Sequence, residues 1–235
     1  MTRWLIAGYA YRGILRADTA GAARSIADPD TFLIGDPVRA PSRECTPVAR
    51  YRSFAQFQAD VAGVLIDRAY HWVLYDPEHW PDTPGPEQAD PVGSMWRFGQ
   101  LAHALGYRVI MAPSQDLGLS SPLRQPGEKI AAWYTRVNIA GAAARHSDVV
   151  DIQAQALTPD PQAYASFTST AAGQIAAANP HALTLAGVST ARGTAAQMRA
   201  AADLVAGTVD GFWLNVPGPD PDYARAIEFL RLTAA

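Results

Sequence analysis

The stretch His71-Trp-Val-Leu-Tyr-Asp-Pro-Glu-His-Trp-Pro-Asp-Thr-Pro-Gly-Pro-Glu-Gln88 begins as an apolar strand and ends as a loop rich in carboxylates, aromatic rings and prolines. Side chains two apart on an extended chain point to the same side, so Leu74, Asp76 and Glu78 share one face if the strand runs that far. Acidic groups at the mouth of a buried strand are costly to desolvate unless they are paired or used. The stretch therefore predicts a buried strand with a candidate active site at its C-terminal end.

Helical patterns lie on both sides of this strand. Ser53 precedes apolar residues at helical spacing, and a second helical pattern after the loop ends at Gly106. The same alternation runs along the chain. The expected strands are 4–9, 32–34, 48–51, 72–75, 108–112, 149–155, 183–188 and 212–216. The expected helices are 19–27, 54–65, 95–105, 128–144, 161–178, 194–205 and 223–230, and Tyr9, Tyr11 and Arg12 fall in a loop after the first strand.

Alternating strands and helices require right-handed crossovers and a parallel sheet covered by helices. Seven strands are clear and 48–51 is a candidate eighth, which favours an α/β fold of the (β/α)8 TIM-like barrel type, irregular in its first third. No composition break marks a linker, so we expect residues 1–235 to form a single α/β barrel domain. No glycine-rich motif for a dinucleotide or a nucleotide phosphate occurs.

Composition narrows the class of partner. The 235 residues are 49% hydrophobic and 17% charged, and the net charge of −3 argues against a nucleic-acid partner. No apolar window approaches a membrane span, the N-terminus lacks a signal sequence, and Cys45 is the only cysteine. Lys129 is the only lysine, and its position away from the strand ends argues against imine chemistry. We expect a soluble cytoplasmic protein with a small-molecule substrate.

In barrels of this kind the active site lies at the C-terminal ends of the strands. Acids, amides and aromatic rings there suit a polyhydroxylated ligand, because apolar sugar faces stack on rings while amides and carboxylates bind hydroxyls. The candidate substrate-binding residues at these ends are Tyr9, Tyr11, Arg12, His79, Trp80, Gln153, Gln155, Arg192, Trp213 and Asn215.

Three segments carry a resemblance to a known group of proteins: Tyr75-Asp76-Pro77-Glu78, Asp151-Ile152-Gln153-Ala154-Gln155 and Gly211-Phe212-Trp213-Leu214-Asn215. Each is an apolar strand with polar residues at its exit, and this pattern resembles the glycoside-hydrolase-like TIM-barrel superfamily. The resemblance covers most of the chain at the level of architecture and assigns no family. It implies a carboxylate acid/base pair that acts on a glycosidic or similar bond.

Such chemistry requires one carboxyl group that stays protonated and a second that stays ionised. Glu78, flanked by an imidazole and an indole, is the candidate acid. Asp76 is expected to be the ionised group or to orient Glu78. Asp116 or Asp151 is expected to supply a second carboxylate from across the barrel. No metal ligand set and no cofactor are predicted.

Other interpretations remain open. Asp76 can start a turn while Glu78 pairs with an arginine, and Asp151 with the glutamines can form a polar barrel interior. A phosphate-directed lyase or cyclase would bind its phosphate or diphosphate ester at Gly187-Val-Ser-Thr-Ala-Arg-Gly-Thr194 and use Mg²⁺ on Asp76, Glu78 or Asp116. A non-catalytic ligand-binding barrel is the third possibility.

Overall fold

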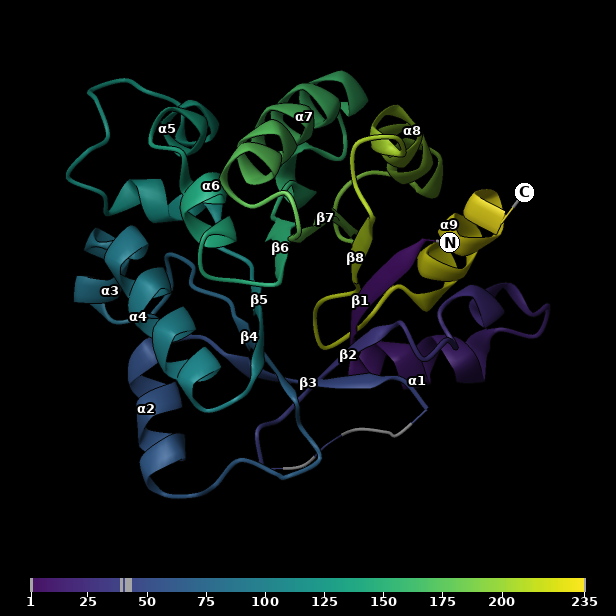
Figure 1. Ribbon diagram of the computed structural model, residues 1–235. Coiled ribbons are helices and arrows are strands. Elements are labelled where there is room, and N and C mark those ends of the chain that lie inside the picture. Colours follow the sequence, from purple (N-terminus) through teal and green to yellow (C-terminus); the bar gives the residue numbers. More distant parts are fainter. Residues whose placement is uncertain (1, 39, 41–43, 235) are drawn as a thin grey trace.

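In the computed structural model, which describes residues 2–38, 40 and 44–234, eight parallel strands form a closed barrel (Figure 1). The strands follow one another in chain order around the barrel, and β1 closes it by pairing with β8. They are β1 (Arg3–Ala7), β2 (Phe32–Gly35), β3 (Thr46–Tyr51), β4 (Trp72–Tyr75), β5 (Arg108–Met111), β6 (Val149–Ile152), β7 (Leu183–Ser189) and β8 (Gly211–Asn215). The predicted (β/α)8 TIM-like barrel is confirmed, and the candidate eighth strand is β3.

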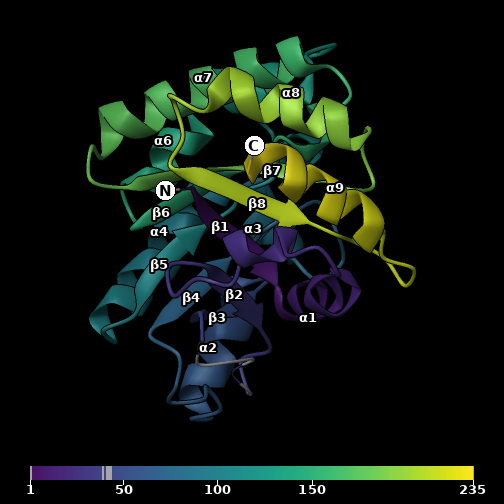
Figure 2. The same cartoon turned by 90° about the vertical axis from the view of Figure 1, so that its right-hand side faces the viewer.

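Helices follow every strand except β2 and pack around the outside of the barrel (Figure 1). The described part of the segment between β2 and β3 contains no helix. The last helix packs beside the first, so the two ends of the helical layer meet (Figure 2). The α-helices are α1 (Gly8–Ala17), α2 (Phe54–Ala62), α3 (Gly85–Ala89), α4 (Pro91–Ala104), α5 (Ile130–Arg136), α6 (Ile139–Ala144), α7 (Pro161–Ala178), α8 (Ala195–Val205) and α9 (Tyr223–Ala234). Short 3₁₀ turns occur at Ala22–Ser25, Gln115–Leu119 and Gln155–Leu157.

Alternate residues of each strand face the barrel interior and the helices. In β4, Leu74 belongs to the apolar cluster inside the barrel, whereas Tyr75 points outward and stacks on Phe98 of α4 with ring centroids 4.6 Å apart. Asp76, two residues after Leu74, therefore continues the interior face at the C-terminal end of the barrel. Strand β4 therefore delivers Asp76 and Glu78 to the C-terminal mouth of the barrel.

Three expected local features require correction. The segment carrying Tyr9, Tyr11 and Arg12 is helix α1, because Ala10, Tyr11 and Ile14 bury one face of it. The expected helix at 19–27 is only a 3₁₀ turn, because the Asp18 carboxylate accepts the backbone N–H groups of Ala20, Gly21 and Ala23 and folds this segment into a tight turn. In addition, the loop that follows β4 contains the short helix α3.

The expected helix at 128–144 is two helices. Asn138 adopts a left-handed conformation with φ of 61°, and its side-chain oxygen accepts the Gly141 N–H at the start of α6. Asparagine tolerates this conformation better than other residues with a Cβ. The predicted cap at Ser53 is confirmed, because its hydroxyl accepts the Gln56 N–H. Within the described residues, no helix has the length and apolar character that a membrane crossing requires.

Candidate active site

Asp76 is fully buried at the end of β4, and each of its carboxylate oxygens has a different neighbour. Arg50 of β3 places its Nη2 2.5 Å from Asp76 Oδ2, and Gln153 donates its amide to Asp76 Oδ1 over 2.7 Å. The same amide nitrogen of Gln153 donates to the Ala112 carbonyl over 2.6 Å. These contacts join a residue of β3 to residues that directly follow β4, β5 and β6, which fixes the Asp76 carboxylate inside the barrel mouth.

Glu78 is half-buried two residues further along the chain. Burial, followed by the negative charges of Asp76 and Asp116, raises its pKa from the ordinary 4.5 to about 8. Arg50 and a hydrogen bond with Gln153 oppose this rise. A carboxyl group with this pKa is protonated at neutral pH and can donate a proton.

Asp116 is the third acid of this cluster. It lies half-buried in the 3₁₀ turn after β5, where Ser114 caps the turn by accepting the Asp116 N–H over 3.4 Å. Asp116 Oδ1 accepts the His79 backbone N–H over 3.0 Å. This contact holds Asp116 against the loop that carries Glu78.

The loop after Glu78 is organised by its own hydrogen bonds. Thr83 accepts the Trp80 indole N–H over 2.8 Å and donates to the Arg52 carbonyl over 2.7 Å. Gln88 donates its amide to the carbonyls of Trp80 and Thr83, and its oxygen lies 2.8 Å from His79 Nδ1. The imidazole of His79 is exposed and also bonded to Ser120, so His79 faces solvent at the edge of the acid cluster.

Trp80 contacts two arginines instead of presenting an open stacking face. The guanidinium carbons of Arg50 and Arg52 lie 5.4 and 4.9 Å from its ring centroid, within the range of a cation–π interaction. The Asp82 carboxylate pairs with the Arg52 guanidinium over 2.5 Å, and both side chains are exposed to solvent. Trp80 therefore orients Arg50 of β3 and Arg52, which lies just after the end of β3.

An open pocket of about 1020 Å³ lies at the C-terminal ends of β1, β2 and β3. Tyr9 and Arg12 of α1 line one side, and Arg50 and Arg52 line another. Arg50 both lines the pocket and forms the ion pair with Asp76. The pocket is thus adjacent to the acids without being lined by Asp76, Glu78 or Asp116, as far as the described residues show.

Asp151 lies apart from this arrangement. Its strand partner in the register is Leu185, a member of the interior cluster, so Asp151 points into the barrel. It is fully buried, and neither carboxylate oxygen has a hydrogen-bond partner among the described residues. Burial raises its pKa well above the ordinary value, with a smaller contribution from Asp76. Asp151 is therefore an enclosed carboxyl group inside the barrel, and its burial favours the protonated form.

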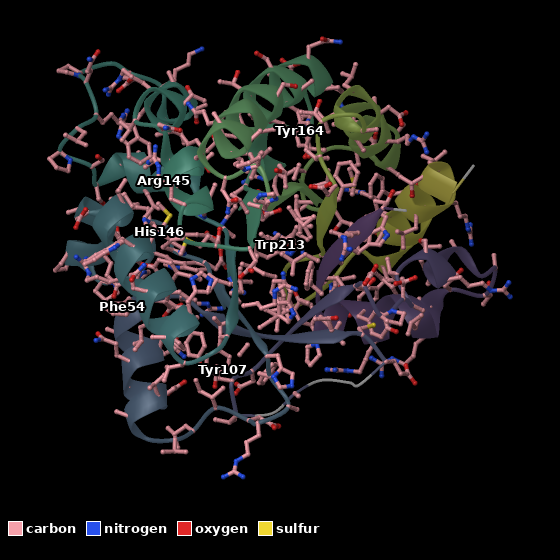
Figure 3. All side chains as sticks on the ribbon, viewed as in Figure 1. Phe54, Tyr107, Arg145, His146, Tyr164 and Trp213 are labelled. Atoms are coloured by element: carbon pink, nitrogen blue, oxygen red, sulfur yellow. The ribbon has the colours of Figure 1, made fainter. Side chains whose placement is uncertain are left out.

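The other predicted substrate-binding residues are spread around the barrel. Tyr11 is 4% exposed and faces the core, because it lies in α1 and not in a loop. Trp213 is 5% exposed and lies in the middle of the molecule among the strands (Figure 3). The Gln155 side chain covers Gly187, and Asn215 is half-buried at the end of β8.

The loop considered for phosphate binding is occupied by contacts within the protein. Thr194 caps α8 by accepting the Gln197 N–H, and Arg225 donates to the carbonyls of Thr190 and Gly193. Arg192 is exposed on this loop. For the Mg²⁺ alternative, the described residues contain no group of three or more His, Cys, Asp or Glu side chains arranged to hold a metal ion.

Two functional candidates, Arg50 and Arg52, were not predicted from the sequence. Arg50 lies in β3 opposite the interior residue Leu74, and Arg52 is exposed just after the end of β3. Both line the pocket, and their spacing of two residues at a strand end was the available signal. Comparison with known proteins adds no further guide: no protein-family model matches the chain, and no curated protein shows significant similarity to it.

Proposed function

We propose that the protein is a barrel enzyme in which Glu78 acts as a general acid on a glycoside or a related polyhydroxylated substrate. The observation that carries the proposal is the half-buried Glu78, whose carboxyl pKa is raised to about 8. Glu78 lies two residues after Asp76, and Asp76 pairs with Arg50 of the open pocket. A carboxylic acid that is neutral at pH 7 and reachable by solvent is the group that proton donation to a leaving oxygen requires.

Asp116 is the best-placed partner for Glu78. It is half-buried, and its charge acts directly on Glu78. Asp76 is fully enclosed with both oxygens engaged, and Asp151 is closed off inside the barrel. We assign Asp76 the role of a positioning residue that keeps Glu78 protonated, and Asp116 the role of the ionised carboxylate.

In the proposed reaction, Glu78 gives its proton to the leaving oxygen as the bond between that oxygen and the sugar carbon breaks. The Asp116 carboxylate stabilises the positive charge that develops on the sugar ring. A water molecule from solvent then forms a bond to the same sugar carbon and gives a proton to the Glu78 carboxylate, which yields the free sugar and restores the acid. Gln153 keeps Asp76 in place beneath the reacting groups, so Asp76 does not rotate toward Glu78.

A panel of 4-nitrophenyl glycosides tests this proposal by release of nitrophenolate. Glu78→Gln should reduce turnover at least about 100-fold, because it removes the proton donor with little change in shape. Glu228→Gln is the matched control on the exposed face of α9 and should retain full activity. Full activity of Glu78→Gln would refute the assignment.

The two alternative functions predict different results for the same variants, measured with their own ligands. A non-catalytic barrel would bind a ligand equally well before and after Glu78→Gln and release no product. A lyase or cyclase that acts on a phosphate or diphosphate ester would lose turnover when Mg²⁺ is removed by EDTA, and Arg192→Ala would weaken its substrate binding.

A further inference from the structure

The pocket beside the acid cluster is rich in guanidinium groups. Arg12, Arg50 and Arg52 contribute three cations to its described lining, whereas Asp36 and Asp82 contribute two carboxylates. The protein as a whole carries a net charge of −3, so this surplus is local. A cavity with a cationic lining favours an anionic ligand.

Two of the three arginines are held in place before any ligand arrives. Arg50 is fixed by Asp76 at 2.5 Å, and Arg52 is paired with Asp82 at 2.5 Å. The Trp80 ring lies within 5.4 Å of both guanidinium carbons. Side chains that are already ordered lose little conformational entropy on binding, which favours affinity.

These arginines retain donors for a ligand. Arg50 contacts Asp76 through Nη2, and its side chain remains partly exposed in the lining of the pocket. Arg12 is exposed on α1 and makes no ion pair with a described residue. Arg52 contacts Asp82 through Nη1, and among the described residues no side-chain partner engages its Nε or Nη2.

Acids compensate part of this charge and leave Arg12 as the cation of the lining without a carboxylate partner among the described residues. Asp76 pairs with Arg50, and Asp82 pairs with Arg52. Asp36 Oδ1 accepts the Val38 N–H over 3.0 Å, so one of its oxygens is engaged in its own turn. The polar groups of Tyr9 and Gln56 complete the lining and can bind hydroxyls.

We infer that this pocket binds a carboxylate or phosphate group on the substrate, so that the substrate is an acidic sugar and not a neutral one. The inference rests on the proposed function in taking the ligand to be polyhydroxylated. The anion contacts Arg12, Arg50 and Arg52, and the sugar hydroxyls extend from it toward Glu78. Planar guanidinium groups match both carboxylate and phosphate geometry, so the class of anion is left to the measurement.

Isothermal titration calorimetry in a phosphate-free buffer tests the inference with three probes: D-glucuronate, D-glucose 6-phosphate and D-glucose. We expect at least one of the two anions to bind at least about tenfold more tightly than glucose. Arg12→Gln should lower the affinity for that anion at least about tenfold. Arg16→Gln, on the same helix and outside the pocket, should leave this affinity unchanged. The anion that binds more tightly identifies the class of charged group that the pocket prefers.

Equal binding of glucose, absence of binding by both anions, or an unchanged affinity in Arg12→Gln would overturn the inference. Circular dichroism shows whether each variant is folded, and the exposed position of Arg12 makes its replacement tolerable. The measurement is independent of turnover. If the anions bind and no glycoside is cleaved, the proposed reaction fails alone; if a neutral glycoside is cleaved and the anions do not bind, the inference fails alone.

Discussion

Arg50 places a guanidinium nitrogen 2.5 Å from the fully buried Asp76 carboxylate and also lines the open pocket. One side chain therefore joins the part of the barrel that can receive a ligand to the part that holds the acids. Asp76 in turn raises the pKa of Glu78. The pocket that would bind a ligand is therefore adjacent to the acids that would transfer a proton. The variants below test the two roles separately.

Asp76→Asn should lower the pKa of Glu78 from about 8, because it removes a negative charge and leaves the Arg50 charge uncompensated. Glu78 is active as an acid below its pKa, so activity in the wild type should fall as the pH rises through about 8. In the variant this fall should occur at a lower pH. A pH–rate profile measures the shift.

Asp220→Asn, on an exposed segment remote from the cluster, is the control for the pH profile. The loss of the Asp76 ion pair should also cost roughly 1–3 kcal/mol of unfolding free energy, because Arg50 loses its partner. An Asp76→Asn variant whose profile coincides with that of the wild type would show that Asp76 does not control Glu78.

Asp116→Asn tests the ionised partner. The amide oxygen can still accept the His79 N–H, so the melting temperature should change little. Turnover should fall roughly 10²- to 10⁴-fold, since the variant lacks the negative charge opposite Glu78. Near-normal turnover in a folded variant would show that Asp116 is not the ionised partner of Glu78. Asp76 or Asp151 would then be the remaining candidate for that role.

Asp151→Asn should change the pH dependence of stability and leave turnover largely intact. An acid whose pKa is raised on folding binds its proton more tightly in the folded state, so the unfolding free energy falls as pH rises above the unfolded pKa of 3.8. The loss is about 1.4 kcal/mol per pH unit until the folded pKa is reached.

Urea denaturation at several pH values measures this effect. Relative to the wild type, Asp151→Asn should become progressively more stable as the pH is raised from about 4, because it has no carboxyl to ionise. A difference in unfolding free energy between the two proteins that stays constant at every pH would contradict the raised pKa of Asp151. Loss of turnover in a stable variant would instead support the catalytic role predicted for Asp151 from the sequence.

Removal of divalent metal ions by EDTA should leave turnover of a glycoside unchanged. The proposed reaction uses carboxyl groups, and the described residues present no three-ligand metal cluster. Assays with and without added Mg²⁺ after EDTA treatment measure the difference. Loss of activity that Mg²⁺ restores would favour the phosphate-directed alternative.

The barrel was predictable because its strands are short apolar runs between turn residues, and strands buried on both faces give this pattern. Trp72–Tyr75 was predicted with its observed bounds. β3 was harder to recognise because two arginines lie at its end, and helix α1 was missed because tyrosines and arginines alternate with its buried residues. The local sequence does not show which of these side chains point into the interior of the barrel.

The acids of the candidate site could be located from the sequence, but their pairing could not. Asp76 and Glu78 follow one strand, so their proximity was expected. The contacts of Asp76 with Arg50 and Gln153 depend on strands that are 26 and 77 residues away in the chain. Only the closed barrel shows that Asp76 is enclosed while Glu78 and Asp116 remain partly open.

The pKa of the Glu78 carboxyl is the measurement that tests the central claim most directly. Carbon-13 NMR of protein labelled at the glutamate side-chain carboxyl, with Glu78→Gln to assign the resonance, follows its titration. We predict a midpoint at about pH 8. A midpoint near the ordinary value of 4.5 would show that Glu78 is ionised at neutral pH and is not the general acid.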